Sequence, residues 1–122
     1  MKGIGIDIIE IERIKDAVSK YGQNFLAKVY TPHEIKYCSK SSAYRIPELA
    51  VRFAAKEAYA KALGTGISGL GRGNTGVNWL DIEVKNNKAG KPMIAFKGQL
   101  QDDVAISLSH SRDNAVATVY VE

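Results

Sequence analysis

The chain opens with apolar residues in strict alternation, which predicts a β-strand over residues 3–9. Ile4, Ile6 and Ile8 share one face of this strand, and the other face carries two glycines and Asp7. Glycines in a strand leave space for the close approach of a backbone, a ligand or a metal ion, here beside a carboxylate. The simpler alternative is that Asp7 caps the helix that follows.

Helical spacing follows the strand and predicts a first helix that ends at Gly22 and then a short second helix. The segment Thr31-Pro-His-Glu34 is typical of a capping box with proline at the first helical position, so a third helix is expected to begin there. His33 is expected to lie exposed in its first turn. The periodic apolar residues of the first two helices are Ile11, Ile14, Val18, Tyr21, Phe25, Leu26 and Val29.

Residues 51–63 are the stretch around which the rest of the chain is organised. They are mostly strong helix formers and are rich in alanine, which predicts a long helix with little bulk on its surface. Pro47 and Glu48 suit the first turn of this helix, and Gly64 suits a left-handed exit from it.

Charged side chains on the predicted long helix fall into two rows. At about 100° per residue, Phe53, Glu57 and Lys61 share one row, and Arg52 and Lys56 form a neighbouring row. A single carboxylate is thus flanked by cations. The pattern alone favours a surface helix with one Glu57–Lys61 ion pair.

Residues 64–73 form a glycine-rich loop. Gly64, Gly66 and Gly69 fit the spacing of the dinucleotide fingerprint G-x-G-x-x-G. That site requires a strand before the glycines, and here a helix precedes them, so a Rossmann site is rejected. The amides of such a loop can still hold a phosphate, a role that Arg72 would suit.

Alternating patterns and turn residues predict two hairpins in the C-terminal part of the chain. In the first strand, Leu80, Ile82 and Val84 are expected to face inward. His110 stands at the end of the third strand, where a lone histidine is usually a surface residue. The strands are expected at residues 79–85, 93–96, 104–109 and 115–121, with turns at residues 86–90 and 111–114.

The order of elements, one strand, several helices and then a run of strands, predicts an α+β fold with a mainly antiparallel sheet. The 122 residues fit a single domain, 1–122, large enough to bury a core without disulfides. The single Cys38 excludes an internal disulfide and favours a reducing compartment. Neither a signal peptide nor a membrane-spanning apolar stretch is visible, so we expect a cytoplasmic protein with no membrane partner.

The formal net charge of +4 and the isoelectric point near 9.2 favour an acidic partner, which could be a nucleic acid, a phosphorylated ligand or an acidic protein. A small basic nucleic-acid-binding module is the main non-enzymatic alternative. Its support is the net charge alone, because the sequence has neither an aromatic-rich strand motif of the RRM type nor a clear helix-turn-helix. We therefore expect no nucleic-acid partner.

Two carboxylates are surrounded by small residues that let other groups approach: Asp7 on the glycine-lined strand face and Glu57 on the alanine-rich helix. If the helix packs on the first strand, the two meet, and Mg²⁺ accepts two carboxylates with water and ligand phosphate as its remaining ligands. Arg52, Lys56 and Lys61 would then face phosphates. A glycosidase pair of carboxylates fits these cations poorly, and zinc or Ser–His–Asp sites lack a supporting pattern.

Several short motifs occur together and in order across nearly the whole chain. They are Gly3-Ile-Gly-Ile-Asp7, Arg52-Phe-Ala-Ala-Lys-Glu57-Ala-Tyr-Ala-Lys61, Gly64-Thr-Gly66, Trp79-Leu-Asp-Ile-Glu-Val84, Gly90-Lys-Pro92 and Ser107-Leu-Ser-His110. Each motif is weak alone. In this combination they closely resemble the holo-[acyl-carrier-protein] synthase family of 4′-phosphopantetheinyl transferases.

The resemblance implies Mg²⁺-dependent transfer of the 4′-phosphopantetheine arm of coenzyme A to a serine of apo acyl carrier protein, with release of adenosine 3′,5′-bisphosphate, in fatty acid biosynthesis. Asp7 and Glu57 match the family's Mg²⁺ ligands, and Glu57 and Lys61 its catalytic positions, with Lys61 on a coenzyme A phosphate. Family members are typically homotrimers with active sites between subunits. The other coenzyme A residues that the resemblance implies are Arg52, Lys56, Gly66, Gly90, Lys91, Pro92 and His110, and those implied for carrier-protein docking are Arg13, Phe25 and Lys28.

Two features depart from the family pattern. The loop at residues 68–78 is longer than in the shortest relatives, which leaves its phosphate contacts open. Lys36 stands where some relatives carry an acid that has been considered a base. The acceptor of the serine proton therefore stays open between a metal-bound water and Glu57.

Overall fold

An N-terminal strand, a group of helices and a run of strands make up the computed structural model, which describes residues 2–67 and 76–122. Every pairing between its named strands is antiparallel, so the predicted α+β fold is confirmed. The helices are α1 (Ile11–Tyr21), α2 (Gln23–Val29), α3 (Pro32–Tyr37), α4 (Ile46–Leu63) and the single 3₁₀ turn η1 (Trp79–Asp81). The strands are β1 (Gly3–Glu10), β2 (Ser39–Lys40), β3 (Ala43–Tyr44), β4 (Ile82–Asn86), β5 (Pro92–Phe96), β6 (Gln99–Leu100), β7 (Val104–His110) and β8 (Asn114–Val121).

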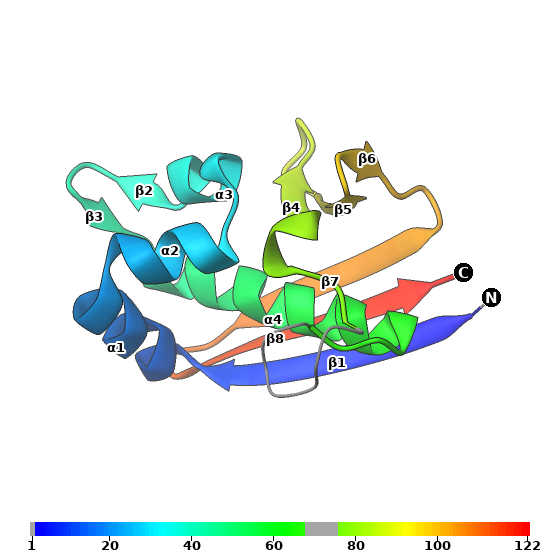
Figure 1. The fold of residues 1–122 in the computed structure, drawn as a ribbon, viewed down its shortest axis with the longest axis horizontal. Coiled ribbons are helices and arrows are strands. Elements are labelled where there is room, and N and C mark those ends of the chain that lie inside the picture. The colour runs from blue at the N-terminus through cyan, green and yellow to red at the C-terminus, as the bar shows by residue number, and fades with distance from the viewer. Residues whose placement is uncertain (1, 68–75) are drawn as a thin grey trace.

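The long helix α4 is the centre of the fold. Figure 1 shows it lying along one face of the sheet β1-β8-β7, with α2, α3 and the small sheet β4-β5-β6 on its other side. Ala54, Ala55, Ala58 and Ala60 are completely buried. The expectation of a surface helix is therefore wrong, because alanines on several faces let neighbouring elements approach α4 from both sides.

Two glycines of β1 let the strand approach the backbone of α4. A Cβ atom on Gly3 would lie 2.0 Å from the Ala62 carbonyl oxygen, and one on Gly5 would lie 1.9 Å from that of Ala58. No side chain fits at either position. Of the alternatives for the glycine-lined face, a backbone is thus what approaches these glycines.

The helix ends follow their local sequence signals. Thr31 and Glu34 form the predicted capping box, and His33 is exposed. Gly64 ends α4 with φ of 78°, as predicted for a left-handed exit. The N-cap of α1 is Glu10, so the alternative in which Asp7 caps that helix is wrong.

The strand expected over residues 79–85 begins only at Ile82. Residues 79–81 form η1 instead, where the Asp81 side chain accepts the Asn78 N–H at 3.1 Å and the Asp81 N–H donates to the Asn78 carbonyl at 3.1 Å. Leu80, expected inward, is therefore half exposed, whereas Trp79 is buried against Phe53 with ring centroids 4.7 Å apart. The hydrogen bonds of this capped turn outweigh the strand preference of the alternating sequence pattern.

Within the described residues, none of the helices combines the length and the apolar character that crossing a membrane would need.

Candidate functional site

The register of β1 on α4 brings the two predicted carboxylates to the same place. Gly3 lies against Ala62 and Gly5 against Ala58, so the strand and the helix run in opposite directions. Two strand residues advance about 6.7 Å and four helix residues about 6 Å, so Asp7 lies alongside the turn of α4 that contains Glu57. Both side chains are half-buried.

Lys61 completes this group, which we call the carboxylate edge (Asp7, Glu57 and Lys61). Its ammonium donates to the Ile6 carbonyl at 3.0 Å and to Asp7 Oδ1 at 3.1 Å. The Lys61 side chain is 52% exposed and that of Asp7 is 18% exposed. An ammonium at this depth holds the carboxylate while staying within reach of a ligand from solvent.

Burial raises the pKa of Asp7 above its ordinary value of 3.8, and the hydrogen bond and charge of Lys61 only partly oppose that rise. The net rise in the pKa means that the lost hydration of the ionised carboxylate outweighs the stabilising charge of Lys61, so a further cation would stabilise the ionised form. The group is thus suited to receiving a cation. Among the described residues, no cluster of three or more histidine, cysteine or acidic side chains is available to hold a metal. A two-carboxylate set of oxygen donors fits Mg²⁺, which keeps several waters and shares substrate phosphates.

The structure assigns Lys56 a different role from the predicted one. Its ammonium is fully buried and donates to Glu34 Oε1 at 2.7 Å, to the Val29 carbonyl at 2.7 Å and to the Trp79 carbonyl at 3.1 Å. All three ammonium hydrogens are thus used inside the protein. Contact between Lys56 and coenzyme A is not supported by this geometry.

Arg52 is also buried, at 1% exposure, but it lies at the base of a groove. Its guanidinium donates to Glu48 Oε1 and to Asn86 Oδ1, each at 2.9 Å, and its charge stacks 4.4 Å from the centre of the Tyr37 ring. Among the described residues, Arg52 Nε is the one buried side-chain nitrogen or oxygen without a hydrogen-bond partner. A ligand acceptor would satisfy it.

We call this groove, of about 360 Å³, the arginine groove; it brings together some of the predicted coenzyme A residues but not all. It contains Arg52 with Gly90 and Pro92, whereas Lys91 lines an adjoining hollow that shares Pro92 and Ile106 with the groove, and His110 lies exposed at the end of β7. The lining residues of the groove are Tyr37, Glu48, Arg52, Asn86, Gly90, Pro92, Ile106, Ser107 and Leu108.

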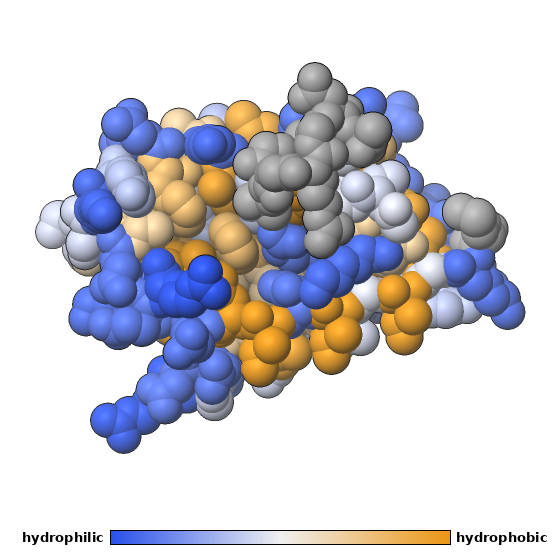
Figure 2. Space-filling model, turned by 60° about the horizontal axis from the view of Figure 1, so that its bottom comes forward, coloured by the Kyte–Doolittle hydropathy of each residue, from blue (hydrophilic) through white to orange (hydrophobic). Residues whose placement is uncertain are grey.

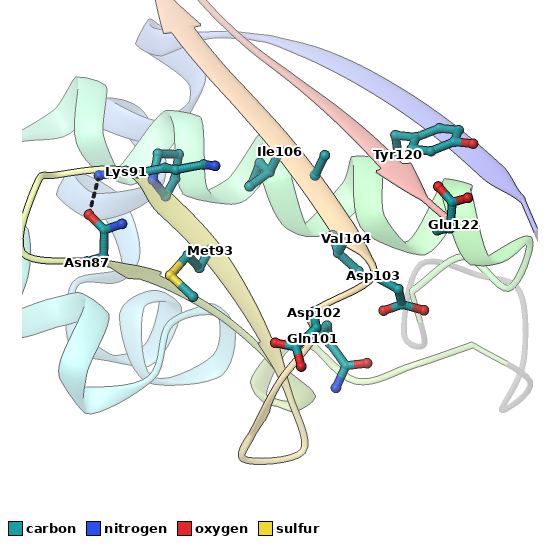
Figure 3. A pocket seen from close by; sticks show the side chains of 12 residues that line it. Asn87, Lys91, Met93, Gln101, Asp102, Asp103, Val104, Ile106, Tyr120 and Glu122 are labelled. Carbon is teal, nitrogen blue, oxygen red and sulfur yellow. Dashed lines mark hydrogen bonds between the residues drawn. The ribbon is translucent and has the colours of Figure 1, made fainter.

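The adjoining hollow is larger, at about 700 Å³, and lies between β5 and the start of β7, beside the end of β8 (Figure 3). Asp102, Asp103 and Glu122 give it a negative rim that does not favour phosphate. Although this hollow is larger than the arginine groove, we do not take it as the active site, because Asp7, Glu57 and Lys61 are not among its lining residues.

The remaining predicted residues lie apart from these groups. Gly66 follows α4 with φ of 69°, and its N–H donates to the Ala60 carbonyl. Arg13 and Lys28 are exposed on the adjacent helices α1 and α2, and Phe25 is half-buried with its ring edge on Tyr30. Arg72 lies outside the described residues.

Several residues that shape these groups carry no functional signal in the sequence. Glu34 is predicted only to cap α3, and its side chain accepts a hydrogen bond from Lys56. Asn86 is predicted only to lie in a hairpin turn, and its side chain accepts a hydrogen bond from Arg52. Tyr37, beneath Arg52, carries no motif. Their partners lie 22, 34 and 15 residues away along the chain, a separation at which local patterns carry no information.

Comparisons with known proteins all identify the same family. Residues 3–119 match the family model of the 4′-phosphopantetheinyl transferase superfamily. The chain is 44% identical to the holo-[acyl-carrier-protein] synthase of Halothermothrix orenii, over 100% of this chain and 98% of that protein. It is 45% identical to that of Chloroherpeton thalassium, over 98% and 96% of the two chains.

Solved structures agree with the sequence relatives. A holo-(acyl-carrier-protein) synthase from Bacillus anthracis, in complex with CoA (3′,5′-ADP), is 40% identical and superposes with a TM-score of 0.78 over 98% of this chain and 95% of that one. The Helicobacter pylori synthase, in complex with coenzyme A, is 31% identical with a TM-score of 0.81 over 98% and 99%.

Proposed function

The chain belongs to the 4′-phosphopantetheinyl transferase superfamily and, within it, to the holo-[acyl-carrier-protein] synthases, and we propose how its residues carry out that reaction. The reaction transfers phosphopantetheine from coenzyme A to acyl carrier protein. A serine hydroxyl of the carrier protein attacks the β-phosphorus of coenzyme A. The bond from that phosphorus to the bridging oxygen breaks, and adenosine 3′,5′-bisphosphate leaves. The observation that supports the assignment is the Lys61–Asp7 ion pair, formed where β1 packs on the turn of α4 that contains Glu57.

Asp7 and Glu57 would hold Mg²⁺, which supplies positive charge to the pyrophosphate when it is bound. The packing of β1 on α4 fixes the two carboxylates relative to each other before any ligand arrives. Such preorganisation matters because phosphoryl transfer depends on positioning and charge neutralisation more than on covalent help from the protein. The serine proton would pass either to Glu57 or to a metal-bound water.

Lys61 would bind the pyrophosphate oxygens. Its half-exposed ammonium already stands beside Asp7, so a phosphate that approaches the carboxylates meets a cation there. As negative charge grows on the departing bisphosphate, that cation offsets it. Lys56 is left out of this site because all its donors are used in the core.

The arginine groove would bind another part of coenzyme A, with Arg52 Nε offered to an anionic or carbonyl oxygen. Arg52 and Glu57 are five residues apart on α4, which places them about 140° apart around the helix. The groove and the carboxylate edge therefore face different directions on one chain. Coenzyme A would contact both only if the carboxylate edge of one subunit met the groove of another.

The outer face of the sheet offers a surface for such an assembly. Ile4, Ile6 and Ile8 are 70%, 60% and 66% exposed, and Figure 2 shows the apolar row that they form. A contiguous apolar row of this kind is typical of an interface. We infer that it joins copies of this chain into a homotrimer with active sites between subunits.

The trimer is tested by Ile6→Glu, which would place three carboxylates in the interface. We expect a folded monomer by light scattering and circular dichroism, with loss of transfer. A variant that stays trimeric, or a monomer with full activity, would contradict the shared site.

Exposed Arg13 and Lys28, with Phe25 between the helices, would dock the carrier protein through charge and apolar contact. Arg13→Glu should raise the KM for carrier protein and leave the KM for coenzyme A unchanged. An unchanged KM for carrier protein would remove α1 from the docking surface.

The transfer itself is tested by mass spectrometry of apo carrier protein incubated with this protein, Mg²⁺ and coenzyme A. We expect a phosphopantetheine adduct with the native chain and none with Glu57→Gln, which keeps the shape of the side chain but not its charge. An adduct formed at a near-normal rate by Glu57→Gln would overturn the metal assignment, whereas no adduct with the native chain would overturn the function.

A further inference from the structure

The hairpin turn between β4 and β5 projects beyond the paired part of its strands. The ladder ends where Asn86 pairs with Pro92, and residues 87–91 lie past it. This turn carries Gly90 with φ of 87° and the neighbouring Lys91, both predicted to contact coenzyme A. A turn outside the ladder needs other contacts to keep its position.

Hydrogen bonds within the turn fix its internal shape. The Asn87 N–H donates to the Lys91 carbonyl at 2.9 Å, and the Gly90 N–H donates to the Asn87 carbonyl at 2.9 Å. The Asn87 side-chain oxygen accepts from the N–H groups of Ala89 at 2.9 Å and Lys91 at 3.0 Å; Figure 3 shows the second bond. These bonds set the shape of the turn but not its place on the protein.

Asn86 supplies the connection to the rest of the molecule. Its Oδ1 accepts from a terminal nitrogen of Arg52 at 2.9 Å, and its Nδ2 donates to the Gly90 carbonyl at 3.0 Å. The orientation of the amide is fixed by chemistry, because a guanidinium can only donate and a carbonyl can only accept. Arg52 itself is held by Glu48 and Tyr37. One amide thus joins a rigid point on α4 to the turn.

We propose that Asn86 is a positioning residue that fixes the Gly90–Pro92 segment against the arginine groove in the orientation that binds coenzyme A. The proposal rests on the proposed function of that groove. Asn86, Arg52, Gly90 and Pro92 all line it, so a shift of the turn changes the shape of the groove directly. Asn86 acts through these neighbours, and its loss affects coenzyme A binding before it affects the transfer step.

Two adjacent asparagines provide a matched pair of variants. Asn86→Asp keeps the acceptor for Arg52 but replaces the donor to Gly90 by an oxygen that repels its carbonyl. Asn87→Asp keeps the acceptor that holds Ala89 and Lys91, so none of its side-chain bonds is lost. Both changes add one negative charge at neighbouring positions. Of the two, Asn86 lines the arginine groove and Asn87 does not, so Asn86→Ala, which adds no charge, separates loss of positioning from repulsion of phosphate.

We expect Asn86→Asp to raise the KM for coenzyme A about tenfold over Asn87→Asp, since 1.4 kcal/mol corresponds to a factor of ten. The kcat and the KM for carrier protein should stay within about twofold of the Asn87→Asp values. A general loss of folded protein would instead lower kcat and leave the KM for coenzyme A unchanged. Calorimetric titration of each variant with coenzyme A should reproduce the difference without catalysis.

Asn86→Ala removes both bonds without adding charge and guards against misfolding of the aspartate variant. It should melt as a folded protein and show a smaller rise in the same KM. Equal coenzyme A affinities for the two aspartate variants, with the native chain active in the same assay, would overturn the role of Asn86 alone. An inactive native chain would overturn the function and this role together.

Discussion

Two lysines of one helix, Lys56 and Lys61, each pair with a carboxylate in very different surroundings. The Lys56–Glu34 pair spans 2.7 Å with both side chains fully buried. The Lys61–Asp7 pair spans 3.1 Å, with the lysine half exposed. Burial lowers the pKa of Lys56 from 10.5, and the charge of Glu34 opposes that fall.

The difference shows how one helix serves two purposes. The three acceptors of Lys56 come from α2, α3 and η1, so this lysine ties three elements to α4. Lys61 donates to the Ile6 carbonyl and the Asp7 carboxylate of β1 and stays half exposed. A buried, fully bonded ion pair fixes the scaffold, whereas the half-exposed pair can exchange a protein partner for a phosphate. The same residue type is structural on one face of α4 and, in the proposed site, binds substrate on another.

The largest effect is expected from Lys56→Met, which leaves the Glu34 carboxylate buried without its cation. Removing one partner of a buried pair costs about 3–5 kcal/mol, so the free energy of unfolding should fall by that amount in urea denaturation at fixed protein concentration. Lys56→Met combined with Glu34→Gln should recover part of the loss, because the uncompensated charge is gone.

Lys61→Met is the matched control on the same helix. Its exposed pair contributes roughly 1 kcal/mol or less, so stability should hardly change while transfer is lost. The comparison fails if the two single variants lose equal stability, or if Lys61→Met retains normal transfer.

A smaller loss of stability is expected from Gly5→Ala, which tests how the carboxylate edge is held. The new Cβ would lie 1.9 Å from the Ala58 carbonyl oxygen, so β1 must move away from α4. Overpacking of this kind costs about 1–3 kcal/mol, and the shift would also separate Asp7 from Glu57 and reduce transfer.

Gly98→Ala separates the steric effect from the loss of a glycine as such. Gly98 has φ of 85°, and no atom of the described residues lies within 4 Å of an added Cβ, so Gly98→Ala reports backbone strain alone. Transfer should survive in Gly98→Ala. If Gly5→Ala is as active as Gly98→Ala, close packing of β1 on α4 does not position the site.

Local signals predicted most of the fold. The capping box at Thr31, the exit of α4 at Gly64 and both hairpins follow from residues within a few positions of each other. The packing of the long helix on the first strand entered only as a condition for Asp7 and Glu57 to meet, and the structure fulfils that condition. The strand predicted at Trp79 was wrong because a capped turn satisfied the same backbone groups locally.

The candidate site was less accessible to sequence reasoning. Glycine and alanine patterns led to Asp7 and Glu57, but a lysine in a polar row of a helix is expected to be exposed. The burial of Lys56 depends on Glu34, which comes from a distant element. The roles of Lys91 and His110 come from the family resemblance and stay predictions, since neither residue lies in the arginine groove.

The smallest change in the free energy of unfolding is expected from Asp7→Asn, which should make the protein more stable at higher pH. Because burial raises the pKa of Asp7 above 3.8, the folded protein holds that proton more tightly than the unfolded chain does. Ionisation of Asp7 therefore costs stability as pH rises through the folded pKa, and asparagine avoids this cost. The stability of Asp7→Asn relative to the native chain should increase above about pH 3.8 and then level off, at roughly 0.5 kcal/mol, the size typical outside the core. Adding MgCl₂ should reverse the order, because a cation bound by Asp7 stabilises only the native chain. Equal stabilisation of both proteins by Mg²⁺ would place the metal away from Asp7 and leave Lys61 as the sole partner of that carboxylate in the proposed site.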